Sequence, residues 1–395
     1  MSIFRYYFDI AFPWEYQYER RQPKSGWVTQ GIRMSSKRMR HLNSLSKQQN
    51  LTEHMKLYIA RYKTLYRKVI REAKRRENDH YILQAHNKSK ATWRIIHKET
   101  GRASPQGQDI ILVKNNEEVT NPGRVAETLN SYFCEIPKEL LEVGGIQRPI
   151  HGNYHLKINQ NPNSMFLHPV TENKLKKVAG SLKNKLTAGL DDVPEYAIKQ
   201  CIDQLTKPLT DIYNASLESG IFPDKLKIAK VIPVHKKGGA RDVSNYRPIS
   251  LLPVFAKLLE KLMYNRLTEF MDRNEILTEE QHGFRTKKST DMALQSFTKR
   301  VQEAIDKKMN PIGIFLDLTK AYDVLSHKVL LSKLDTYGIR GVANKWFKSY
   351  LSLRKQCVEI NSKQHRTVVT ATRDIMNGVP QGSTLGPHII PAIHK

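Results

Sequence analysis

Apolar residues recur every three or four positions in the segment that starts at residue 51, and Lys or Arg fill most positions between them. The apolar set is Leu51, Met55, Tyr58, Tyr62, Leu65 and Val69. This spacing is typical of one face of an α-helix. Because the pattern continues through Ala85 towards Trp93 and Ile96, we predict a long helix with one apolar seam and a basic back.

Further along the chain, the pattern predicts helices mixed with a few short strands. We expect strands over 110–113 and 227–235, and helices over 125–133, 171–182, 195–205, 207–219, 251–271 and 290–307. Thr171 is an expected N-cap, and Gly220 is expected to end the helix over 207–219. Since strands and helices do not alternate regularly, the predicted fold class is α+β.

One apolar run ends in a carboxylate. Residues 312–317 are rich in Ile, Phe and Leu and end at Asp317, which predicts a strand with an acidic residue at its tip. A carboxylate at a sheet edge can bind a divalent metal ion. A lone Asp at a strand end is more often a cap or turn residue, so that alternative stays open for Asp317.

Two further strings could contact a nucleotide. Gln381 and Gly382 follow Pro380, which places a carboxamide beside a residue with no side chain to obstruct a ligand. Arg247 precedes Pro248 in an extended stretch, where its guanidinium could clamp a phosphate. The alternatives are a structural turn for the first string and a surface salt bridge for Arg247.

Composition divides the chain into segments. Gly, Pro and Asn gather over 144–164, which we interpret as a linker. Before it we expect a disordered leader over 1–26 and a basic, mainly helical connector over 27–143. The main domain is expected over 165–395.

Charge is strongly unbalanced. Lys and Arg number 65 against 38 acidic residues, and residues 20–102 alone hold 22 basic and 5 acidic side chains. Such an excess points to a polyanionic partner, and nucleic acid is the leading candidate. A solvated helix face is the alternative, and a membrane patch is disfavoured because no apolar run approaches the ~20 residues of a spanning helix. The candidate nucleic-acid contacts are Arg61, Arg67, Lys68, Arg71, Lys74, Arg75 and Arg76.

The cysteines and the N-terminus bear on compartment. Cys134, Cys201 and Cys357 are too far apart to predict a zinc site, and their odd number favours a reduced intracellular compartment. Arg5 and Asp9 interrupt the first apolar stretch, so no signal peptide is predicted.

Taken in order, these strings resemble the reverse transcriptase of non-LTR retrotransposons of the jockey type, from about Trp27 to Pro387. The matching stretches are 222–223, 230–238, 246–252, 281–285, motif A over 317–323 and motif B over 381–386. The resemblance implies an incomplete right-hand polymerase, with fingers and a partial palm, preceded by the basic helical connector. It also implies an RNA-directed DNA polymerase that adds deoxynucleotides to a primer 3′-hydroxyl by two-metal catalysis with Mg²⁺. The implied partners are an RNA template, a DNA primer or RNA–DNA duplex, and deoxynucleoside triphosphates, in the nucleus or cytoplasm.

The resemblance also implies roles for single residues. Asp317 would bind Mg²⁺, and Tyr322 would exclude a ribose 2′-hydroxyl. Gln381 and Gly382 would contact the incoming nucleotide. Arg247, Lys236 and Lys237 would contact phosphates. Asp323 fits the family pattern, but an N-cap for a helix starting near Val324 explains it equally well.

The residues after Pro387 depart from the family. They contain no carboxylate and do not resemble the segment that leads to the Tyr-x-Asp-Asp hairpin and the thumb. Asp317 alone cannot hold two metal ions, so we expect this chain to be inactive by itself. Without the hairpin, the predicted strand over 312–317 would expose an apolar edge. A non-catalytic nucleic-acid-binding remnant is the alternative; a viral RNA-dependent RNA polymerase is disfavoured by the Pro-Gln-Gly of motif B.

Overall fold

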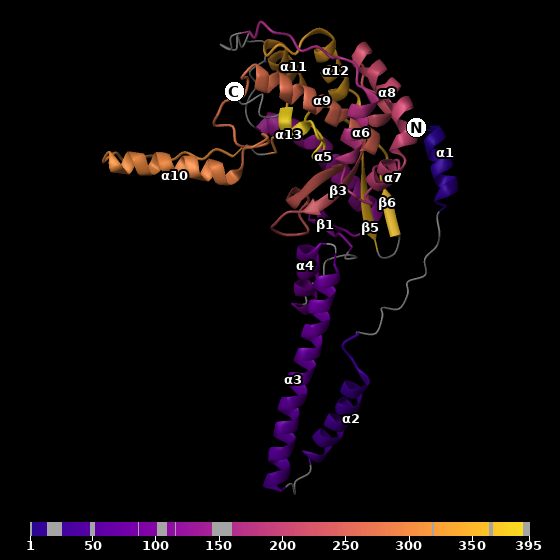
Figure 1. Ribbon diagram of the computed structural model, residues 1–395, viewed down its shortest axis with the longest axis vertical. Coiled ribbons are helices and arrows are strands. Elements are labelled where there is room, and N and C mark those ends of the chain that lie inside the picture. Colours follow the sequence, from indigo (N-terminus) through magenta and orange to yellow (C-terminus); the bar gives the residue numbers. More distant parts are fainter. Residues whose placement is uncertain are drawn as a thin grey trace. The chain divides into compact units, whose positions relative to one another are not determined.

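The structure is a computed structural model that describes residues 2–13, 26–47, 52–85, 87–100, 109–114, 116–143, 160–317, 320–362 and 366–389. The chain divides into two compact units, Met1–Gln106 and Gly107–Lys395 (Figure 1). Most of the predicted linker over 144–164 lies outside the described residues. Among the described residues, no helix combines the length and hydropathy that crossing a membrane requires.

The first unit is helical. It contains α1 (Ser2–Ala11), α2 (Gln30–Leu45), α3 (Glu53–Gln84) and α4 (Lys88–Glu99). Residues 2–11 therefore form a helix, where the sequence analysis expected a disordered leader. The long basic helix is confirmed as α3, although a break at Ala85 separates it from α4. Met39 and Leu42 of α2 pack against Ile59 of α3, and Tyr58 and Tyr62 of the predicted seam are half-buried beside them. Met55, Leu65 and Val69 of that seam are exposed, so its predicted burial is confirmed only in part.

The second unit is built around a sheet of β3 (Ile228–His235), β4 (Tyr246–Leu251), β5 (Arg354–Ser362), β6 (Arg366–Val369) and β7 (Arg373–Ile375). The order is β4-β3-β5-β6, and β7 also pairs with β5. The β3–β4 pair is antiparallel and the β3–β5 pair is parallel. With the hairpin of β1 (Leu112–Lys114) and β2 (Glu117–Val119), this mixture confirms the predicted α+β class.

Helices form the other layer of this unit. They are α5 (Pro122–Val143), α6 (Glu172–Gly180), α7 (Glu195–Gln200), α8 (Ile202–Ser219), α9 (Val254–Arg273), α10 (Thr290–Asp306), α11 (His327–Thr336), α12 (Gly341–Leu351) and α13 (Gly386–Ile389). Two short 3₁₀ helices span Asp224–Leu226 and Val243–Asn245. The Thr171 hydroxyl caps α6, and Gly220 ends α8 in the left-handed conformation, as predicted.

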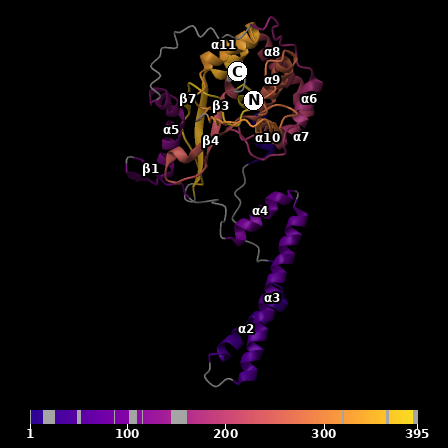
Figure 2. The same cartoon turned by 90° about the vertical axis from the view of Figure 1, so that its left-hand side faces the viewer.

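Helix α5 packs on the sheet of the second unit. Leu129 and Phe133 of α5 share a core with Val231 of β3 and Val358 of β5, and Figure 2 shows α5 along one side of the strands. The division between units thus falls near residue 106, whereas the sequence analysis placed it within 144–164. The apolar contacts of α5 with strands far along the chain explain the difference.

The predicted strand over 312–317 does not form. Its side chains are exposed, with Ile312 and Leu316 at 89% and 90%, and none of these residues pairs with a strand in the described parts of the chain. The preceding helix α10 buries none of its residues and extends away from the other helices of the unit (Figure 1). An apolar run forms a strand only where a neighbouring strand accepts its hydrogen bonds, so the strand prediction was wrong.

Candidate active site

The Pro-Gln-Gly turn, residues 378–386, is held by backbone hydrogen bonds from two directions. Val379 N–H donates to the Tyr322 carbonyl at 2.7 Å, and Ser250 N–H of β4 donates to the Gln381 carbonyl at 2.7 Å. These bonds bring together Tyr322 and Gln381, which lie about sixty residues apart in the sequence. The structure therefore places two of the predicted site residues beside each other.

Two glycines let the turn approach its neighbours closely. Gly378 has φ 78° and Gly382 has φ 127°, which are conformations that side chains other than glycine's rarely adopt. A Cβ on Gly378 would collide with the Tyr322 carbonyl, and one on Gly382 would collide with the Ser250 carbonyl. Glycine is required at both positions by the backbone geometry.

A buried carboxylate holds the far end of the turn. Glu260 of α9 is fully buried, and its two oxygens accept hydrogen bonds from Thr384 N–H at 2.7 Å and from the Tyr350 hydroxyl at 3.0 Å. Burial raises the pKa of Glu260, and the nearby Arg354 guanidinium opposes that rise. The turn is thus fixed to α9 as well as to β4 and Tyr322.

A pocket lies against this turn. Tyr322, Asp323 and Gln381 line it together with residues of α5, β4 and the 375–377 segment. Burial raises the pKa of Asp323 to about 6, although the charge of Lys320 acts in the opposite direction. Asp323 caps no helix, because α11 begins only at His327 and Ser326 caps it; the capping alternative for Asp323 was wrong.

Asp317 lies apart from this pocket. It is exposed at the end of the 311–317 segment and does not line the pocket. Within the described residues, no group of three or more His, Cys, Asp or Glu side chains could hold a metal ion. The described residues therefore do not fit the Mg²⁺ pair that the sequence resemblance implied.

The predicted phosphate ligands gather at one end of the β3–β4 hairpin. Lys236 and Lys237 lie in its turn, and Arg247 pairs across the strands with Val234. All three cations are exposed, and none forms an ion pair with another described residue. Pro248 lines the pocket, and successive strand residues point to opposite faces. Arg247 therefore faces away from Tyr322 and Gln381.

The basic back of α3 is also exposed. Lys74 pairs with Glu99 at 3.7 Å and lies 5.4 Å from the Trp27 ring centroid, Arg75 pairs with Asp79, and Arg76 pairs with Glu72. The other predicted nucleic-acid ligands of α3 form no ion pair among the described residues; they are Arg61, Arg67, Lys68 and Arg71. Exposed ion pairs stabilise by only about 0–1 kcal/mol, so a phosphate could displace them.

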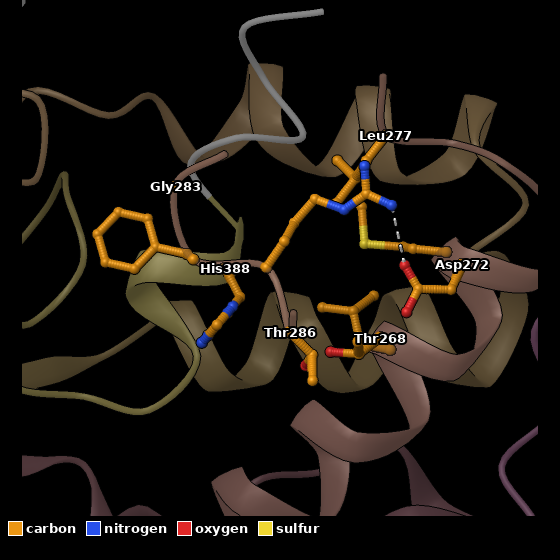
Figure 3. A pocket seen from close by; sticks show the side chains of 10 residues that line it. Thr268, Asp272, Leu277, Gly283, Thr286 and His388 are labelled. Carbon is orange, nitrogen blue, oxygen red and sulfur yellow. Dashed lines mark ion pairs between the residues drawn. The ribbon is translucent and has the colours of Figure 1, made fainter. Parts of the chain in front are cut away.

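A second pocket is lined in part by the segment that contains Gly283 and Arg285. Asp272 of α9 and His388 of α13 line it, and Arg285 Nη2 is 3.6 Å from the Asp272 carboxylate (Figure 3). The His388 ring lies 4.1 Å from the Tyr264 ring centroid, and burial lowers the His388 pKa. This pocket contains none of the predicted catalytic or nucleotide-binding residues.

A family comparison covers the pocket's central elements. Residues 234–393, which include β4, Tyr322 and the Pro-Gln-Gly turn, match the model of the family described as reverse transcriptase (RNA-dependent DNA polymerase). This segment is a reverse transcriptase domain.

Comparisons with individual proteins agree with that assignment. The chain is 33% identical over 231 residues to a probable RNA-directed DNA polymerase from transposon BS of Drosophila melanogaster, covering 57% of this chain and 24% of that protein. It is 33% identical over 233 residues to the RNA-directed DNA polymerase from mobile element jockey of the same organism, covering 57% and 24%. For the jockey protein of Drosophila funebris the values are 29% over 302 residues, covering 75% and 31%. The chain thus spans about a quarter to a third of these relatives' length.

Sequence reasoning missed two parts of this candidate site. Glu260 could have been found, because it follows Ala256 by four residues and precedes Met263 by three, on the apolar face of α9. The α5 residues that line the pocket carry no such signal, since Phe133, Cys134 and Pro137 look like ordinary core residues in a helix assigned to the connector.

Proposed function

We propose that this chain is a portion of a non-LTR retrotransposon RNA-directed DNA polymerase, with its fingers and part of its palm in residues 165–395. In this proposal Tyr322 favours deoxynucleotides, and Gln381 and Gly382 contact the incoming nucleotide. The observation that supports it is the hydrogen bond from Val379 to the Tyr322 carbonyl, because it joins motif A and motif B at one pocket.

The chain is proposed to lack polymerase activity by itself. Two-metal catalysis needs several carboxylates around the ions, and the described residues offer no such cluster near Asp317. The test is a primer-extension assay with purified protein, an RNA template, a DNA primer, deoxynucleotides and Mg²⁺. No extended product is expected. Extension above a no-enzyme control would show that the chain assembles a metal site.

A second candidate function is nucleic-acid binding through the basic connector. It is favoured by the exposed cations of α3 that have no ion-pair partner among the described residues. Neutralising phosphates releases counterions, so binding weakens steeply with salt. The partner is proposed to be the RNA template or an RNA–DNA duplex, contacted through its backbone without reading its sequence.

A salt titration tests this candidate. Replacing four cations by Gln should lower the slope of log K against log salt by about 3, since each phosphate contact adds about 0.7–0.9. The four are Arg61, Arg67, Lys68 and Arg71. The matched control removes four exposed, ion-paired cations of the second unit, Lys176, Arg273, Lys299 and Arg300. Equal slopes for the two variants would show that net charge, and not the face of α3, determines binding.

A further inference from the structure

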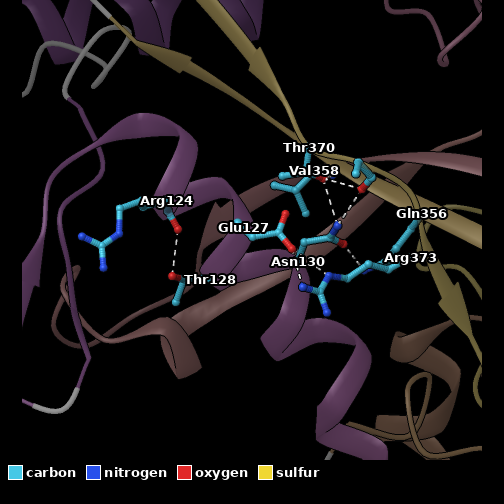
Figure 4. A network of polar contacts seen from close by, with 9 residues as sticks. Arg124, Glu127, Thr128, Asn130, Gln356, Val358, Thr370 and Arg373 are labelled. Carbon is cyan, nitrogen blue, oxygen red and sulfur yellow. Dashed lines mark hydrogen bonds and ion pairs between the residues drawn. The ribbon is translucent and has the colours of Figure 1, made fainter.

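Helix α5 is fixed to the sheet by a network of polar side chains centred on the buried Asn130 amide. The Asn130 amide is fully buried, donates to Thr370 Oγ1 at 2.9 Å and to the Ala371 carbonyl at 3.1 Å, and accepts from Gln356 Nε2 at 3.2 Å (Figure 4). Glu127 accepts a hydrogen bond from Arg373 Nε at 2.9 Å. These bonds tie α5 to β5 and β7 and to the segment between β6 and β7. Buried networks of this kind hold their members in one arrangement.

The same helix supplies one wall of the pocket beside the Pro-Gln-Gly turn. Phe133, Cys134 and Pro137 line it together with Tyr322 and Gln381. The preceding residue of α5, Tyr132, accepts a hydrogen bond from Lys320 Nζ at 2.9 Å, with Nζ 4.7 Å from its ring centroid. Helix α5 thus contacts the segment that carries Tyr322, although it lies outside the residues that match the reverse transcriptase family.

The other walls offer the chemistry of a nucleobase site. Pro248 and Pro380 contribute compact apolar groups that can pack against the face of a planar ring. Asn377 and Gln381 are half-buried, and neither carboxamide has a hydrogen-bond partner among the described side chains and backbone. A carboxamide both donates and accepts, which matches the alternating donors and acceptors along a base edge. Two half-buried carboxamides without a partner among the described protein groups leave donors and acceptors free in one pocket for a polar, planar ligand.

We propose that α5 completes a nucleobase-binding pocket of the reverse transcriptase domain, with Phe133, Cys134 and Pro137 as one of its walls. The inference rests on the proposed function, because it takes the pocket beside Tyr322 and Gln381 as the place where nucleic acid or nucleotide binds. The base is part of a bound strand or of a free deoxynucleotide. The functional domain therefore extends upstream to include residues 122–143.

Cys134 provides the test. Cys201 is exposed and Cys357 is buried, so a Cys201→Ser protein presents Cys134 as its reporter thiol in the pocket. Burial raises the pKa of the Cys134 thiol to about 11, so labelling by methyl methanethiosulfonate should be slow near neutral pH and is best followed at pH 8.5–9. The ligands are a single-stranded DNA oligonucleotide, the same oligonucleotide made abasic, and a mixture of deoxynucleoside triphosphates.

A base in the pocket should slow Cys134 labelling at least about fivefold. Protection by the oligonucleotide alone assigns the base to a strand, and protection by triphosphates alone assigns it to a free nucleotide. Asn377→Ala should reduce the protection, and Gln302→Ala, on the exposed face of α10, should leave it unchanged. Equal protection by the abasic oligonucleotide would overturn the nucleobase assignment.

Fluorescence anisotropy in the same samples distinguishes failure of the α5 proposal from failure of the proposed function. Binding of labelled oligonucleotide with no change in Cys134 labelling by any ligand would overturn the role of α5 and leave the proposed function standing. Absence of binding by every ligand would overturn both. Protection of Cys134 that disappears in Asn377→Ala would support the pocket as described.

Discussion

The Pro-Gln-Gly turn and the 311–317 segment, which leads into motif A, have opposite surroundings. The turn is bound by Tyr322, Ser250 and Glu260, and much of it is buried. The 311–317 segment has a more apolar sequence, but its side chains are exposed and it pairs with no described strand. Hydrogen-bond partners supplied by distant elements, and not apolar content, decide which of the two segments is held in place.

The largest expected effect comes from Glu260, whose carboxylate holds the turn to α9. Glu260→Ala removes the acceptor of Thr384 N–H and leaves the buried Arg354 charge uncompensated, which should destabilise the protein by about 3–5 kcal/mol. Urea unfolding measures this loss. Glu269→Ala, which breaks an exposed ion pair with Arg273 on the same helix, should cost less than about 1 kcal/mol. Similar losses for both variants would contradict a special role for Glu260.

A pH titration tests whether Asp323, the motif A residue that lines the pocket, is buried. Its pKa in the folded protein is about 6, above the ordinary 3.8 of the unfolded chain, so the folded state binds the proton more tightly. The stability of the protein should therefore fall as pH rises from about 4 to about 6 through this group. Asp323→Asn removes that fall and should be more stable than the parent at pH 7 by roughly 3 kcal/mol.

As pH falls below about 4 the stabilities of the parent and Asp323→Asn should converge, because the parent carboxyl becomes protonated in both states. Urea unfolding at pH 3.5, 5 and 7 gives the comparison. A difference between the two proteins that does not change with pH would mean that Asp323 is solvated, and that the pocket is more open than its lining residues indicate.

The glycines of the turn offer a smaller effect with a close control. Gly378→Ala places a methyl group against the Tyr322 and Asp323 carbonyls at a positive φ, and should cost about 1–3 kcal/mol. Gly239→Ala lies in the β3–β4 turn, where a Cβ meets nothing within 4 Å, and should change stability by less than about 1 kcal/mol. The two variants carry the same chemical change, so thermal unfolding of each isolates the backbone effect. A neutral Gly378→Ala would show that the turn is loosely held.

Local patterns along the sequence predicted much of the fold and part of the site. The helix α3, the Thr171 cap and the Gly220 stop each depend on residues within a few positions, and the structure confirms them. The proximity of Tyr322 and Gln381 followed from the family resemblance, which implied that both contact one nucleotide. The unpaired 311–317 segment, the α5 wall and the hydrogen-bond partners of Glu260 depend on contacts between residues about a hundred or more positions apart, or on their absence. Periodicity carries no information about such contacts.

The smallest effect is expected in the 311–317 segment. Leu316 is 90% exposed, so Leu316→Ser should change the free energy of unfolding by less than about 0.5 kcal/mol, while it removes an apolar side chain that favours self-association. Urea unfolding measures the first effect, and sedimentation velocity at increasing protein concentration measures the second. A loss of more than about 2 kcal/mol would mean that Leu316 is buried in solution, within the chain or between copies. Sedimentation separates these cases, because burial between copies makes the loss depend on protein concentration. An unchanged stability would support the contrast with the Pro-Gln-Gly turn. The 311–317 segment would then tolerate a polar residue, whereas the turn depends on the single carboxylate of Glu260.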